Sequence, residues 1–89
     1  MIITKKITTK YFEDVKSGVK NFELRLANFE IKSGDTLLLK EVDAETKKLT
    51  GRELSKKVTY VLKTKDITFW PKEKVDEFGY QIISLKEDE

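Results

Sequence analysis

Residues 36–62 read T-L-L-L-K-E-V-D-A-E-T-K-K-L-T-G-R-E-L-S-K-K-V-T-Y-V-L, and they decide the fold. Residues 36–42 form a nearly continuous apolar run, and residues 52–62 repeat apolar side chains with the period of a strand. Both patterns are typical of β-strands. The polar residues 43–51, which end in a glycine, therefore predict the loop of a β-hairpin.

The flanking segments add three predicted strands and two short helices. Strands are expected at residues 2–8, 20–26 and 80–86, where β-branched or alternating apolar residues occur. One helix is expected from Thr8 or Thr9 to Gly18, and another from Pro71 through Glu77. Because two such short helices cannot cover a sheet, the order β-α-β-β-β-α-β predicts an α+β fold with a small curled or closed mixed sheet of about five strands.

Length and composition exclude several classes of protein. A chain of 89 residues predicts one domain, at residues 1–86, followed by a frayed acidic tail at residues 87–89. Cysteine and histidine are absent, which excludes disulfides, thiolate or imidazole metal ligands, and a cysteine nucleophile. We therefore expect no metal and no cofactor. No apolar run approaches the length of a membrane helix and no secretory signal is present, so a cytoplasmic protein without membrane contact is expected.

The charge is mildly basic. Three of the 16 acidic residues are the last three of the chain, which leaves 18 basic and 13 acidic side chains, a net charge of +5, in residues 1–86. This excess suits an anionic partner without requiring one.

The segment Gly18-Val19-Lys20-Asn21-Phe22-Glu23-Leu24-Arg25 is the most informative for function. Glu23 and Arg25 are two residues apart and share a face of the predicted strand. A solvated strand face with one surface ion pair, worth about 0–1 kcal/mol, would explain this pattern equally. However, the chain has 16 lysines and only two arginines, Arg25 and Arg52. The two arginines therefore need a specific reason, and a planar bidentate donor to a carboxylate, a phosphate or a base provides one. For Arg52, a pair with an acid across the hairpin is the alternative.

Aromatic residues lie among the charges. Tyr11 and Phe12 interrupt a basic run, an arrangement that suits nucleic-acid binding; its members are Lys5, Lys6, Lys10, Lys16 and Lys20. Phe12 is expected to pack the helix onto the sheet instead. For Tyr11, packing onto the sheet and stacking on a base are both open. Trp70 is expected to plug one end of the core, with a base-stacking surface at the rim of a cleft as the alternative.

The spacing G-x-K-x-x-E-x-R, formed here by Gly18, Lys20, Glu23 and Arg25, resembles the signature of the ASCH superfamily. Members of that superfamily are small β-barrels of the PUA-like class. Residues 11–18, residues 32–35 and a hairpin at residues 40–61 with the turn T-G-R-E also resemble a compact bacterial and phage subgroup described only as a domain of unknown function. The resemblance implies a PUA-like barrel that binds RNA in a cleft beside the motif strand.

The resemblance implies roles for individual residues. Lys20 and Arg25 would contact phosphate or base, and Glu23 would orient Arg25 or accept a hydrogen bond from a base. The other expected nucleic-acid-binding residues are Lys6, Lys10, Tyr11, Arg52 and Trp70. The expected partner is RNA or a nucleotide-like anion, and the expected protein is a monomer.

Two alternatives stay open. One is a pocket for a modified nucleoside, or a small hydrolase, because a branch of the ASCH superfamily hydrolyses acetylated cytidine. That branch has a threonine nucleophile where this chain has Glu23, and no catalytic serine, phosphate-loop or metal motif is found, so no enzyme activity and no catalytic residue are expected. The other is a protein-interaction module.

Overall fold

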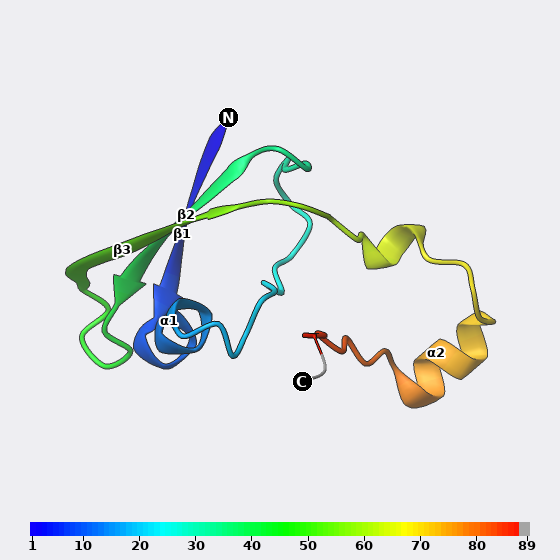
Figure 1. Ribbon diagram of the computed structural model, residues 1–89. Helices are drawn as coiled ribbons and strands as arrows, with labels where there is room; N and C mark the ends of the chain where they lie inside the picture. The colour runs from blue at the N-terminus through cyan, green and yellow to red at the C-terminus, as the bar shows by residue number, and fades with distance from the viewer. Residues whose placement is uncertain (88–89) are drawn as a thin grey trace.

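A computed structural model describes residues 1–87 (Figure 1). Of the acidic tail predicted at residues 87–89, residues 88 and 89 lie outside this range. The centre of the structure is a three-stranded mixed sheet with the order β1-β2-β3. Its strands are β1 (Ile2–Thr8), β2 (Thr36–Val42) and β3 (Leu49–Lys57). β1 pairs parallel to β2 from Ile2↔Thr36 to Thr8↔Val42, and β2 pairs antiparallel to β3.

One helix covers part of this sheet and completes the core. α1 (Thr9–Lys16) follows β1 directly and contacts β1 and β2. Phe12 and Val15, three residues apart, share its buried face, as the period of an α-helix requires. They pack with three strand residues, Ile7, Leu37 and Leu39, in one small hydrophobic cluster. The prediction that Phe12 packs the helix onto the sheet is confirmed, since only 2% of its surface is exposed.

The β2–β3 hairpin is tighter than the sequence predicts. The Asp43 carboxylate accepts hydrogen bonds from the backbone N–H groups of Glu45 and Thr46, at 2.9 and 3.0 Å. This turn holds the pKa of Asp43 below its usual value, because backbone N–H donors favour the charged carboxylate. Lys47 takes the left-handed backbone conformation. β3 begins at Leu49 and ends at Lys57, whereas the sequence predicts a strand over residues 52–62.

The chain beyond β3 leaves the sheet. Residues 60–87, which we name the C-terminal arm, contain the short η1 (Thr64–Asp66) and α2 (Lys72–Phe78). Pro71 precedes α2, and Gly79, with positive φ, ends it. Within residues 1–87, no substantial contact joins η1 or α2 to another helix or strand. Figure 1 shows the arm, coloured yellow-green to red, running away from the sheet before its end returns toward the middle of the molecule.

The predicted closed barrel of about five strands is wrong. The hairpin and the first strand form, but residues 20–26 and 80–86 have no strand conformation, and the sheet stays open with three strands and two short helices. Residues 20–26 alternate apolar and polar side chains and residues 80–86 do so in part, yet the backbone of neither segment pairs with a strand of the sheet. Without a partner strand, their backbone polar groups stay outside any ladder.

The helices of residues 1–87 include none with the length and apolar character needed to cross a bilayer.

Candidate functional site

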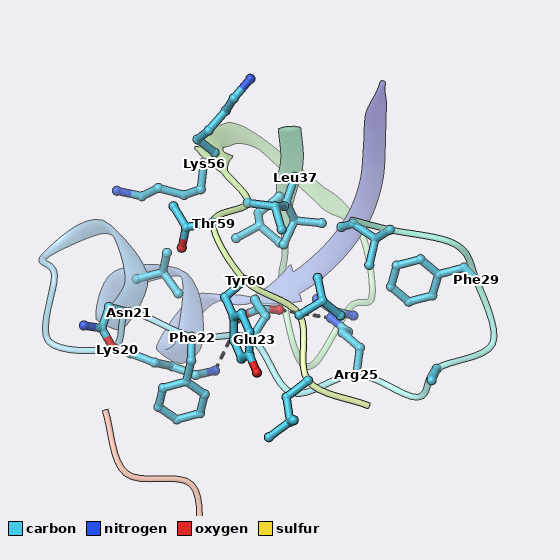
Figure 2. A pocket seen from close by; sticks show the side chains of 18 of the residues that line it. Lys20, Asn21, Phe22, Glu23, Arg25, Phe29, Leu37, Lys56, Thr59 and Tyr60 are labelled. Carbon is cyan, nitrogen blue, oxygen red and sulfur yellow. Dashed lines mark hydrogen bonds and ion pairs between the residues drawn. The ribbon is translucent and has the colours of Figure 1, made fainter. Parts of the chain in front are cut away.

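A cavity of about 420 Å³ opens beside the sheet. Three stretches of chain surround it: the residues that follow α1, the buried face of β2, and residues 56–63 (Figure 2). Its apolar wall includes Val15 of α1 and Leu37 and Leu39 of β2, together with Ile31 and Val58, which pack against the same core cluster. Phe22, Phe29 and Tyr60 add three aromatic rings. The volume lies in the range of small-ligand pockets, which are mostly apolar with a few polar groups.

The charged lining of this cavity is strongly basic. Among residues 1–87, five basic residues line it: Lys20, Arg25, Lys56, Lys57 and Lys63. Its one carboxylate is Glu23. Glu23 pairs with two of the five, and the remaining lysines have no carboxylate partner among residues 1–87. Uncompensated positive charge around a concave surface favours an anionic ligand.

The residues of G-x-K-x-x-E-x-R all line the cavity, although their segment is not a strand. Gly18 has φ +85°, a conformation that favours glycine, and it turns the chain directly after α1. The Lys20 backbone N–H then donates to the Asp14 carbonyl at 2.9 Å, which fixes the start of the segment against the helix. The turn therefore positions the charged residues that follow.

Glu23 lies between the two cations of the motif. Its Oε1 is 3.5 Å from Lys20 Nζ, and its Oε2 accepts from Arg25 Nε at 3.0 Å. Arg25 also donates through Nη2 to the Lys6 carbonyl of β1 at 2.7 Å, so the guanidinium is held in one orientation. The side chains are only 18%, 15% and 30% exposed for Lys20, Glu23 and Arg25, respectively. The expected role of Glu23 in orienting Arg25 matches this geometry (Figure 2).

Two aromatic rings border the Lys20 ammonium. Its Nζ lies 4.5 Å from the centre of the Tyr11 ring and 5.4 Å from that of Phe22. These are cation–π distances, and both rings keep more than a third of their surface exposed. Exposed ring faces beside a cation combine stacking with phosphate attraction, which is the pattern of single-stranded nucleic-acid sites.

Other predicted site residues lie outside this arrangement. Lys6 contributes its carbonyl group to the Arg25 contact, whereas its side chain is exposed. Lys10 pairs with Asp14 at 3.1 Å on the outer face of α1. Trp70 lies on the C-terminal arm, where its ring contacts Phe69 edge to face and Tyr80 at a tilt. The plug interpretation of Trp70 is wrong, since the indole is 60% exposed and no barrel end exists for it to close.

Arg52 belongs to a separate network on β2 and β3. Its guanidinium donates to both oxygens of Glu41 at 2.8 Å, and it also pairs with Glu13 of α1. The Thr50 hydroxyl donates to Glu41 as well, and the Arg52 guanidinium lies 4.7 Å from the Phe12 ring centre. Glu41 is buried, so a bidentate partner is what makes its charge tolerable. Arg52 thus ties the hairpin to the helix outside the cavity, which corresponds to the structural alternative for this arginine.

This network predicts how stability depends on pH. Arg52, and then Thr50, lower the pKa of Glu41 from 4.5 to about 2. A carboxyl group whose pKa is lower in the folded state stabilises fully above pH 4.5, and this contribution is lost as the pH falls toward 2. Denaturant midpoints measured across this range should therefore fall less on acidification in Glu41→Gln than in the wild type.

The control is Glu45→Gln, which removes an exposed carboxyl from the loop of the same hairpin. It should keep the wild-type pH profile, and equal profiles for the wild type and Glu41→Gln would contradict the assignment.

The sequence analysis did not predict five of the residues that line the cavity. Lys56, Lys57 and Lys63, together with the rings of Phe29 and Tyr60, line it from segments that the motif does not include. The only signal was the adjacent lysine pair in the middle of the longest predicted strand, residues 52–62. Period-two alternation sends neighbouring residues to opposite faces, so this pair gave no prediction of a shared site.

Within the part of the chain that the structure describes, no three carboxylates come together as a metal site would require. Among protein families, residues 4–75 match the model described as "Domain of unknown function (DUF3850)". No curated protein and no solved structure matches the chain.

Proposed function

Because the chain belongs to the family described as "Domain of unknown function (DUF3850)", whose description names no activity, we propose a function from the site itself. The protein binds RNA, or another single-stranded nucleic acid, in the cavity between the G-x-K-x-x-E-x-R segment and residues 56–63. The proposal also includes the resemblance of the G-x-K-x-x-E-x-R segment to the ASCH signature, which implies RNA binding beside this segment.

One observation supports the proposal most strongly: among residues 1–87, five basic residues and one acidic residue line a cavity that aromatic residues also line. Phosphate groups would be attracted by the lysines at the rim, and a base would enter between the ring faces and the apolar wall. Attraction of phosphate and stacking of bases are the two contributions that single-stranded nucleic-acid sites combine.

The motif residues then take distinct roles. Arg25 is already fixed by Glu23 and by the Lys6 carbonyl, so little side-chain entropy is lost when it meets a phosphate or a base edge. Lys20 adds charge between the rings of Tyr11 and Phe22. Glu23 keeps both cations in place and offers acceptor capacity to an amino group of a base.

The two arginines provide a matched test. In Arg25→Lys the charge remains but the planar fork is lost, so affinity for single-stranded RNA should fall about tenfold while stability changes by less than about 1 kcal/mol. Fluorescence anisotropy with a labelled oligonucleotide measures the affinity, and thermal melting measures the stability.

Arg52→Lys is the control, because this arginine lies in the Glu41 network and away from the cavity. It should keep the RNA affinity and lose stability. If Arg25→Lys binds RNA as the wild type does, the assignment of Arg25 fails.

A pocket for one modified nucleoside is the second candidate, supported by the cavity volume and by the proximity of Lys20 to Glu23. A salt titration separates the two functions. Polynucleotide binding weakens steeply with salt because counterions are released, whereas a neutral nucleoside responds little.

A further inference from the structure

The C-terminal arm exposes an unusual amount of apolar surface. Five of its large apolar side chains that lie outside the cavity are more than half exposed: Phe69, Trp70, Phe78, Ile83 and Leu85. Scattered single apolar residues are normal on a protein surface, but a concentration of them marks an interaction site.

The dimensions of the whole chain lead to the same conclusion. A compact protein of 89 residues has a radius of gyration of about 12 Å, whereas this chain has 15.1 Å. A compact protein of this mass exposes about 5,400 Å², whereas this chain exposes 7696 Å². The excess over the whole chain is roughly 2,300 Å², and a standard protein–protein interface buries about 800 Å² on each partner. The chain thus exposes enough surface for a stable interface, and the apolar side chains of the arm lie within it.

Charge indicates which partner would cover it. Residues 1–59 hold 13 basic and nine acidic side chains, a net charge of +4, whereas residues 60–87 hold five lysines and five acids. Two copies of the basic part repel each other, but two copies of the neutral arm do not. The charges of α2 pair within the helix, as in Lys72–Asp76 and Lys74–Glu77, so this part of the arm carries both signs and no large excess of either.

We propose that the protein forms a homodimer in which the C-terminal arms of two copies pack against each other through their apolar side chains. The interface is isologous, with the same surface of each copy contributing. It covers the aromatic cluster around Trp70 and the apolar residues near Ile83, and it does not include residues 60–63, the part of the arm that lines the basic cavity. This proposal departs from the monomer that the sequence analysis expects.

The test uses the full chain, freed of nucleic acid, over a wide range of concentrations. Sedimentation equilibrium should give twice the 10.4 kDa mass of the chain at high concentration and the monomer mass on dilution. Trp70 is the only tryptophan, so its fluorescence emission should shift to shorter wavelength as the dimer forms and the indole loses water. A monomer at every concentration, whether extended or compact, would overturn the proposal.

Two variants identify the surface. Ile83→Asp places a charge on an exposed apolar position outside the core cluster, and it should weaken the dimer about tenfold or more. Gln81→Asp adds the same charge at a polar position of the arm and should leave the dimer nearly unchanged. Far-UV circular dichroism checks that both variants remain folded. A dimer that resists Ile83→Asp, or that both substitutions weaken equally, would exclude the arm as the interface.

Discussion

Phe12→Ala is expected to leave the protein largely unfolded at room temperature. Phe12 is 2% exposed and belongs to a core cluster of only five buried residues. Truncation of a buried phenylalanine costs about 3–5 kcal/mol, because both its burial and its packing are lost. A domain of this length has a total stability of about 4–13 kcal/mol, and so small a core favours the lower part of that range.

The neighbouring aromatic residue is the matched control. Tyr11 is 51% exposed and lies on the side of α1 that faces Lys20, so Tyr11→Ala should keep the fold and reduce RNA affinity instead. Urea denaturation followed by circular dichroism measures both variants. Near-normal stability of Phe12→Ala would mean that the cluster is not the core of the fold.

The second large effect is expected at the lysine pair of β3. Lys56 and Lys57 line the cavity without a carboxylate partner among residues 1–87. If each contacts a phosphate group of a single strand, the double substitution Lys56→Gln with Lys57→Gln should lower the slope of log affinity against log salt by about 1.4. At about 0.05–0.1 M salt this corresponds to a loss of roughly 25- to 65-fold in affinity for single-stranded RNA.

The opposite end of the same strand supplies the control. Lys47 and Lys48 are also adjacent, and they lie just before β3, away from the cavity. Changing both to glutamine removes the same charge and should leave the salt slope close to that of the wild type. Equal effects of the two double variants would mean that only the net charge of the protein matters.

The parts of the fold that the sequence predicts correctly depend on local patterns. The apolar residues of α1, of β2 and of the hairpin each recur at the spacing of a single helix or strand. Each of these elements packs against an element next to it in the sequence. The alternation in residues 20–26 predicts which side chains share a face. It contains no information on whether a free strand edge lies within reach, and here none pairs with it.

In the candidate site, too, only the residues that are close in sequence were predicted together. Lys20, Glu23 and Arg25 are close in sequence, so one motif was enough to group them. Lys56 and Lys57 reach the cavity only because β3 pairs with β2, which forms the cavity wall. Trp70 shows the converse error, since its predicted role depended on a barrel that does not form.

The wall of the cavity has a consequence for how this fold can diversify. Residues 17–35 join α1 to β2 without a helix or strand, while the register of the sheet is fixed by strand pairing alone. Insertions or deletions in such a segment change no strand pair, and each doubling of its length costs only about 0.6 kcal/mol of closure entropy. The depth and width of the cavity can therefore be altered independently of the sheet. A sheet that stays constant, next to a connecting segment that can vary in length, allows one small scaffold to bind different ligands.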